Sequence, residues 1–162
     1  VPNHQLNRIT SLHTRANVAY FGTFGYELDL NKLTDEEIAE VKAQIIFMKE
    51  YRELIQFGNF YRLKSPFDGN ETVWMTVSED KRKALVFWYR ERNVVNAEFT
   101  RVRLQGLDPD LIYKNEYNGT ENYGDELMNL GLLTTDVTAG EPTNEDLPCT
   151  DYESRIYVLT AE

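Results

Sequence analysis

Residues 34–58 constrain this chain more than any other stretch, because they predict one long helix. Thr34 and Glu37 have the spacing of a capping box, and the acidic first turn favours the positive end of a helix dipole. Gly58 predicts the end of the helix. One apolar stripe recurs at helical spacing and consists of Ile38, Val41, Ile45, Met48 and Ile55. This stripe must be buried against another part of the chain or against a partner.

The residues before the helix predict a single strand–loop–helix unit. Residues 10–16 are expected to form a short helix capped by Thr10, and the apolar run at residues 18–22 is expected to form the strand. A strand that is apolar on both faces is typical of a covered parallel sheet. One such unit cannot close a sheet, so residues 1–57 are interpreted as a remnant of a larger α/β domain.

After residue 58 the apolar period changes from helical to two. Val73, Met75 and Val77 alternate with polar or aromatic residues, and Val102 and Leu104 alternate with arginines. Strands are expected over residues 59–65, 72–77, 84–89, 98–105, 111–117 and 155–160. Residues 124–131 are expected to form a short helical piece and residues 134–152 a long loop. The fold class predicted is therefore α+β, with one long helix followed by an antiparallel β-sandwich over residues 58–162.

Charge and composition exclude several classes of partner. The net charge is −10, whereas a nucleic-acid or acidic-membrane partner is bound through an excess of Lys and Arg. No apolar run approaches the length of a transmembrane helix. We therefore expect neither a nucleic-acid partner nor a membrane partner.

The cysteine and histidine content gives further expectations. Cys149 is the only cysteine, which excludes an internal disulfide and predicts a cytoplasmic location. His4 and His13 are the only histidines and lack both a third ligand and a helical ligand spacing, so no metal site is expected. No cofactor is expected either.

Several short sequence motifs occur in a fixed order along the chain. They lie at residues 2–5 (PNHQ), 22–29 (GTFGYELD), 49–56 (KEYRELIQ), 65–67 (SPF), 106–109 (GLDP) and 124–128 (GDELM). This ordered set resembles the carboxyl-terminal portion of bacterial α-galactosidases of glycoside hydrolase family 36. The resemblance extends from residue 1 to about residue 133, and residues 134–154 match less well.

The resemblance implies a (β/α)8 barrel that ends in this chain. Residues 18–22 would be its last strand and residues 34–58 its last helix, so residues 1–57 would belong to the barrel and residues 58–162 to a carboxyl-terminal β-sandwich. The working face of such a barrel lies at the carboxyl ends of its strands. Rim candidates for substrate binding are accordingly Asn3, His4, Gln5, Thr23 and Phe24.

The family's reaction is retaining hydrolysis of terminal α-galactosides, which needs two carboxylates about 5 Å apart. The resemblance places the nucleophile in a Lys-Trp-Asp-type strand end, yet neither Trp74 nor Trp88 is followed by Asp. The acid/base motif is also absent, so no catalytic residue is assigned. Glu27 and Asp29 have the spacing of a pair, but loop-anchoring roles are the expectation for them.

These observations predict a non-catalytic carboxyl-terminal part of an α-galactosidase. The first residue, Val1, suggests a preceding segment. The 162-residue chain by itself is expected to be inactive. Its expected partners are the missing amino-terminal and barrel parts of the parent enzyme, with a galactoside as the parent's substrate.

Two alternatives remain open at this point. A β-sandwich that exposes Trp74 could be a free-standing carbohydrate-binding module, since sugars stack on aromatic rings, whereas Trp88 is expected in the core. The apolar stripe of the long helix could instead mark an oligomerisation module, buried against the sandwich or a second copy. A homo-oligomer is therefore an additional expectation.

Overall fold

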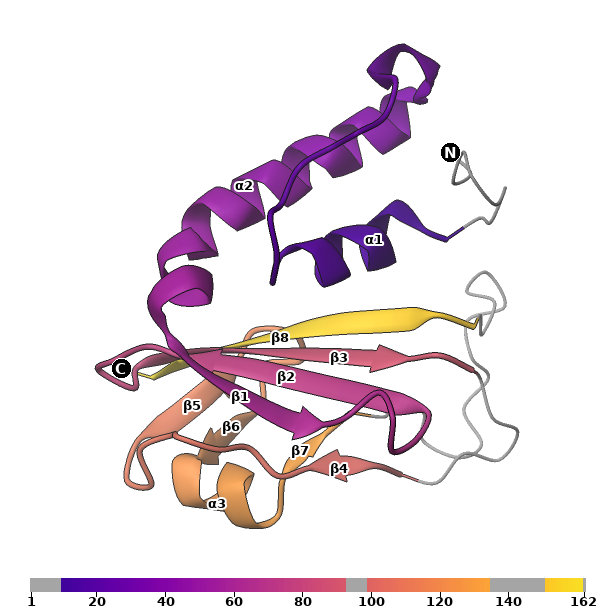
Figure 1. The fold of residues 1–162 in the computed structure, drawn as a ribbon. Coiled ribbons are helices and arrows are strands. Elements are labelled where there is room, and N and C mark those ends of the chain that lie inside the picture. The colour runs from indigo at the N-terminus through magenta and orange to yellow at the C-terminus, as the bar shows by residue number, and fades with distance from the viewer. Residues whose placement is uncertain (1–9, 93–98, 135–150, 162) are drawn as a thin grey trace. The chain divides into compact units, whose positions relative to one another are not determined.

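A computed structural model describes residues 10–92, 99–134 and 151–161 of the chain (Figure 1). The chain divides into two compact units, Val1–Gly58 (unit 1) and Asn59–Glu162 (unit 2). The division falls one residue beyond the boundary that the sequence suggested. Each unit has a hydrophobic cluster of its own. The architecture is a mixture of helices and antiparallel strands, which confirms the predicted α+β class.

The long helix is confirmed as α2, Asp35–Phe57. Its amino-terminal end has the predicted capping box: the Thr34 hydroxyl accepts the Glu37 N–H at 3.2 Å, and the Glu37 carboxylate accepts the Thr34 N–H at 2.9 Å. Gly58 is the carboxyl-terminal cap, and its N–H donates to the Leu54 carbonyl. Local sequence therefore determines both ends of this helix.

The predicted strand at residues 18–22 is wrong. Helix α1 covers Leu12–Ala19 and includes Val18, and it is capped by Ser11, not Thr10. Leu12, Ala16 and Tyr20 are buried at i, i+4 spacing, so the apolar run continues a helical face. A short apolar run fits a buried helix and a buried strand equally well, and here tertiary packing selected the helix.

Unit 1 covers part of the apolar stripe of α2 with its own residues. Leu12 of α1, Leu33 and Val41 form the buried cluster of this unit. Partly buried side chains that pack against this cluster are Tyr26, Leu28, Ile38 and Ile45. A short 3-10 helix, η1 (Leu30–Lys32), precedes Leu33. Residues of α1 and of the segment before α2 thus bury part of a stripe that was expected to pack on the sandwich or on a second copy.

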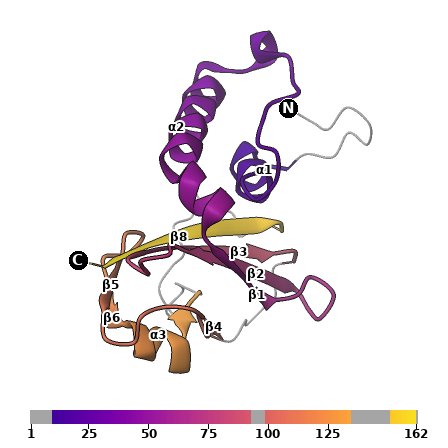
Figure 2. The same cartoon turned by 60° about the vertical axis from the view of Figure 1, so that its left-hand side comes forward.

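Unit 2 is built on one six-stranded antiparallel sheet with the order β1-β2-β3-β8-β5-β6 (Figures 1 and 2). Its strands are β1 (Asn59–Lys64), β2 (Glu71–Val77), β3 (Lys83–Arg90), β5 (Ile112–Asn115), β6 (Glu121–Tyr123) and β8 (Glu153–Ala161). The last strand, β8, pairs with β3 on one side and β5 on the other. The end of the chain therefore joins the two halves of the sheet.

One face of this sheet is covered by a smaller layer, as Figure 1 shows. The layer consists of the two-stranded pair β4 (Arg101–Val102) and β7 (Leu132–Leu133) and of helix α3 (Gly124–Asn129). The predicted second sheet is thus only a short ribbon supplemented by a helix. Strands β6 and β7 were not predicted, and β4 is shorter than the range expected for it.

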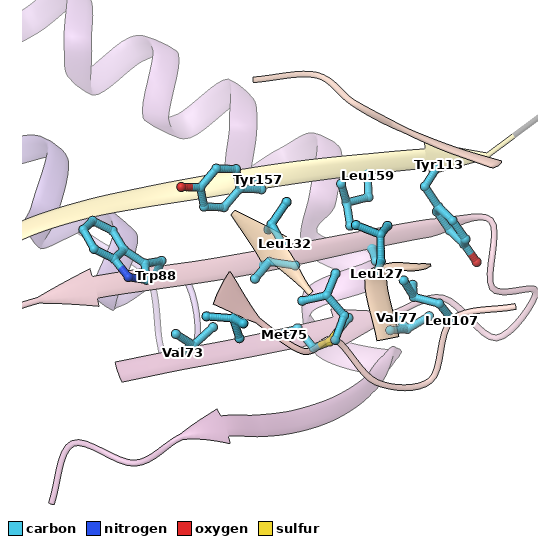
Figure 3. Packing of buried hydrophobic residues seen from close by; sticks show 14 residues of the cluster. Val73, Met75, Val77, Trp88, Leu107, Tyr113, Leu127, Leu132, Tyr157 and Leu159 are labelled. Carbon is cyan, nitrogen blue, oxygen red and sulfur yellow. The ribbon is translucent and has the colours of Figure 1, made fainter. Parts of the chain in front are cut away.

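The hydrophobic core of unit 2 lies between these two layers (Figure 3). Strands β2 and β3 supply Val73, Met75, Val77, Ala84, Val86 and Trp88, all of them 0–1% exposed. Val102 and Leu104 point inward and Arg101 and Arg103 are exposed, so the predicted alternation is confirmed there. Trp88 is in the core, as expected. The predicted loop over residues 134–152 lies largely outside the described residues.

Gly124 is required where α3 begins, because a Cβ at this position would lie 1.9 Å from the carbonyl oxygen of Asp108. We predict that Gly124→Ala lowers the free energy of unfolding of unit 2 by about 1–3 kcal/mol, the usual cost of forced overpacking. The measurement is urea unfolding followed by tryptophan fluorescence, which reports on unit 2 because Trp74 and Trp88 both lie there. Gly69→Ala is the matched control, since no atom lies within 4 Å of its Cβ. Equal midpoints for the two variants would contradict the prediction.

Capping gives a second prediction, for unit 1. Thr34→Ala removes the hydroxyl that accepts the Glu37 N–H and should destabilise α2 by about 1 kcal/mol. Thr34→Ser keeps the hydroxyl and should behave like the unaltered chain. Thermal loss of the helical circular dichroism signal measures both variants, and coincident curves for Ala and Ser would show that the capping box contributes nothing.

Candidate functional site

The structure describes two of the five predicted rim residues. Thr23 is exposed and Phe24 is half-buried, and both lie in the irregular segment between α1 and η1. Asn3, His4 and Gln5 lie outside the described residues. Whether these five residues line a substrate site therefore stays a prediction.

Phe24 belongs to an aromatic cluster in unit 1. Its ring centroid lies 4.8 Å from that of Tyr20 in a stacked arrangement and 5.4 Å from that of Tyr26. Phe47 of α2 lies 4.9 Å from Tyr20, and Tyr51 lies 4.7 Å from Phe47. Such ring pairs stabilise a fold beyond the area they bury. Phe24 therefore holds the segment that carries Thr23 against Tyr20, which in turn contacts Phe47 of α2.

Gln44 is the polar centre of this cluster, at a buried position of α2. Its side-chain oxygen accepts the Tyr26 hydroxyl at 2.5 Å, its backbone carbonyl accepts the Tyr20 hydroxyl at 3.3 Å, and its amide donates to Glu40 at 2.9 Å. Burial is the main cause that raises the pKa of both tyrosines, with the nearby Glu40 carboxylate adding to it. Both phenols therefore stay protonated as donors at neutral pH.

Of Glu27 and Asp29, it is Asp29 that makes loop-anchoring hydrogen bonds of the kind expected for both. The Asp29 carboxylate accepts the backbone N–H of Asn31 at 3.1 Å and its side-chain amide at 3.0 Å, which caps η1. Lys32 lies 4.0 Å from the other carboxylate oxygen. Glu27 is exposed. Asp29 thus has a structural role at the start of η1.

Within the described residues, no group of three or more His, Cys, Asp or Glu side chains is arranged to hold a metal ion. His13 contacts the Asn17 side chain at 3.1 Å, four residues along α1. Over the same part of the chain, none of the helices is long and apolar enough to cross a membrane.

Trp74 lies on the sheet face opposite the core, where the sequence analysis placed it. It is half-buried, with its ring centroid 5.6 Å from Tyr89 and 6.4 Å from Phe60. These edge-on and tilted contacts occupy part of the ring surface that a stacked sugar would need. The structure therefore gives no specific support to a carbohydrate-binding role for Trp74.

A cluster of charged side chains, missed by the sequence analysis, lies at the end of the sheet where β2 begins. The Glu71 carboxylate accepts the Trp88 indole N–H at 3.0 Å and the Thr100 hydroxyl at 3.2 Å, and it pairs with the Lys64 ammonium. Glu71 thereby connects β1, β2 and β3 with the residue that precedes β4. It is the hub of this end of unit 2.

Two arginines extend the cluster across β3 and β8. The Glu153 carboxylate pairs with Arg90 at 2.5 Å and with Arg155 at 2.6 Å. Both guanidinium groups lie over the Trp88 ring, 5.4 and 5.5 Å from its centroid, in cation–π geometry. Both carboxylates of the cluster are thus held by cations, an arrangement that stabilises the end of the sheet.

The signal for this cluster is visible only once the register is known. In the strand register, Glu71 lies opposite Arg90, Arg90 lies opposite Glu153, and Trp88 lies opposite Arg155 on neighbouring strands. A slip of one residue would move every side chain of a strand to the other face, so the charges favour this register over its neighbours. Along the sequence, the strands β2, β3 and β8 that carry these residues are separated by segments of different lengths, so the sequence alone does not show which charges meet.

The Glu71 contacts generate a prediction with an internal control. Glu71→Leu leaves the Trp88 N–H, the Thr100 hydroxyl and the Lys64 charge without their acceptor, and should cost about 2–4 kcal/mol of unfolding free energy. Glu71→Gln keeps one acceptor oxygen and should lose less than half of that. Urea unfolding monitored by tryptophan fluorescence measures both. A leucine variant as stable as the glutamine variant would show that the hydrogen bonds contribute nothing.

Comparison with known proteins identifies the family. The family model for the glycosyl hydrolase family 36 C-terminal domain matches residues 71–159, and the melibiase model matches residues 1–58. The chain is 51% identical over 132 residues to α-galactosidase AgaA of Geobacillus stearothermophilus, covering 82% of this chain and 18% of that protein. It is 44% identical over 132 residues to the bifunctional α-galactosidase/sucrose kinase AgaSK of Mediterraneibacter gnavus, covering 82% of this chain and 14% of that protein.

Comparison with solved structures identifies the same family. The crystal structure of AgaA matches with a TM-score of 0.87 at 44% identity, and the α-galactosidase of Lactobacillus brevis gives the same values. Each match covers 100% of this chain and 21% of the solved chain. The chain therefore belongs to glycosyl hydrolase family 36, as its sequence motifs suggested. It spans about a fifth of the length of the relatives it matches and corresponds to their carboxyl-terminal region.

Proposed function

We propose that this chain is the non-catalytic carboxyl-terminal part of a longer α-galactosidase that hydrolyses terminal α-galactosides with retention. The observation that carries the proposal is the match over 100% of this chain to only 21% of solved α-galactosidase chains. The sequence contains neither of the two aspartate motifs that the resemblance requires for catalysis. A retaining glycosidase cannot work without its carboxylate pair, so the reacting groups belong to the remainder of the enzyme.

The two units have separate roles in this proposal. The melibiase match at residues 1–58 supports unit 1 as the closing part of the catalytic barrel, with α2 as its last helix. The C-terminal-domain match at residues 71–159 supports unit 2 as the carboxyl-terminal β-sandwich, although its second layer is small. Residues 18–22 do not serve as the last barrel strand in this proposal, because α1 extends to Ala19.

The proposed substrates are α-galactosyl oligosaccharides. AgaA variants have been solved in complex with stachyose and with raffinose, and another AgaA variant has been solved with 1-deoxygalactonojirimycin. Within the assembled enzyme, Asn3, His4, Gln5, Thr23 and Phe24 remain the candidates of this chain for the rim of the substrate site, and the Phe24 ring stacks on Tyr20.

Location and assembly belong to the same proposal. The single cysteine supports a reducing, cytoplasmic compartment, and a homo-oligomer is proposed for the longer enzyme. No specific observation favours the free-standing sugar-binding alternative, since Trp74 packs against Tyr89 and Phe60.

The direct test is hydrolysis of a nitrophenyl α-galactoside. We predict no turnover above the buffer rate for the purified 162-residue chain and measurable turnover for a longer protein that contains it. Geobacillus AgaA serves as the positive control. Turnover by the isolated chain, reproducible and lost on unfolding, would contradict the proposal, because the chain would then hold a complete carboxylate pair.

A further inference from the structure

The loop between β1 and β2 presents an apolar ring to solvent. Phe67, at its tip, is 94% exposed, the most exposed of the large hydrophobic side chains in the described residues. Its neighbours Pro66, Asp68 and Gly69 are also exposed. A full phenylalanine ring in water forgoes the stabilisation of roughly 1.5–3 kcal/mol that burial would give.

This loop is held in one conformation. The Ser65 hydroxyl accepts the Phe67 N–H at 3.2 Å, and the Ser65 carbonyl accepts the Asp68 N–H at 3.3 Å. At the other side of the loop, the Asn70 side-chain amide donates to the Arg92 carbonyl at 2.7 Å and accepts the Arg92 N–H at 2.8 Å. A ring presented on a pre-organised loop loses little entropy when it docks, which is the property of a binding anchor.

Other aromatic residues are exposed at the same end of unit 2. Phe99, next to the Thr100 that bonds Glu71, is 57% exposed, and Tyr152 at the start of β8 is 49% exposed. The Tyr152 N–H donates to the Glu91 carbonyl, and the Glu91 N–H donates to the Asn70 carbonyl. Hydrogen bonds therefore connect the β1–β2 loop with the end of β3 and the start of β8, all at one end of the strands in Figure 1.

We infer that Phe67 is an anchor by which unit 2 docks into an apolar pocket on the part of the longer polypeptide that precedes this chain. The inference rests on the proposed function, since it requires that preceding part to exist. This chain covers only 18% of the length of AgaA. In an enzyme of similar size, the remaining part of the polypeptide is large enough to provide the pocket.

The size of the contact favours the same polypeptide over a separate copy. An aromatic side chain buries about 150–250 Å². A stable interface between separate proteins buries roughly 800 Å² on each partner, which one loop tip does not provide. A tethered contact needs much less area, because the link keeps the effective concentration of the two surfaces in the millimolar range.

The test is thiol labelling of Phe67→Cys, made together with Cys149→Ser in both the 162-residue chain and the longer enzyme. The labelled peptide is quantified by mass spectrometry. We expect the thiol introduced at position 67 to react at least about tenfold more slowly in the longer enzyme than in the chain, at every protein concentration. Glu79→Cys, in the exposed turn between β2 and β3, is the matched control and should react at similar rates in both.

Each other outcome overturns the inference. Equal rates at position 67 in the two proteins would show that nothing covers the ring. Protection that disappears on dilution would assign the surface to a second copy. A second measurement uses Phe67→Ser, which should lower the melting temperature of the longer enzyme and leave that of the chain unchanged. The galactosidase assay separates the two claims, since an active enzyme with equal labelling rates refutes only the anchor.

Discussion

The pairing of β8 between β3 and β5 is the constraint on which unit 2 depends. Without β8 the six-stranded sheet would separate into β1-β2-β3 and the β5–β6 pair. The pairing spans a long stretch of sequence, so its loop-closure entropy must be offset by what the strand brings. Tyr157 and Leu159 enter the core, and Glu153 and Arg155 complete the charged cluster around Trp88. Core packing and charge pairing thus select the same register.

Local signals in the sequence were sufficient for α2 and for the central strands. A capping box and a carboxyl-terminal glycine determine the ends of α2, and strict alternation identified the inward faces of β2 and β4. The failures came where tertiary context decides. The apolar run at Val18 suits a helix or a strand, and the two-residue pairing of β4 with β7 is too short to leave a periodic pattern.

The site was less predictable than the fold. The resemblance correctly indicated the family, but its described rim residues are either exposed, as Thr23 is, or packed, as Phe24 is, so their roles depend on surfaces outside this chain. The hub at Glu71 escaped prediction because its partners come from β1, from β3 and from the residue before β4. The two limits differ in cause: the proposed roles of the rim residues depend on surfaces that this chain lacks, whereas the partners of Glu71 are brought together by pairings between distant segments of this chain.

We propose that this chain completes an α-galactosidase whose reacting carboxylates lie elsewhere, and reconstitution of the enzyme from two parts tests this proposal most directly. The longer enzyme is produced without the 162-residue segment that corresponds to this chain, and galactoside hydrolysis is measured before and after co-expression with this chain. We predict that each part alone is inert and that the two together hydrolyse the substrate. Full activity of the shortened enzyme without this chain would contradict the claim.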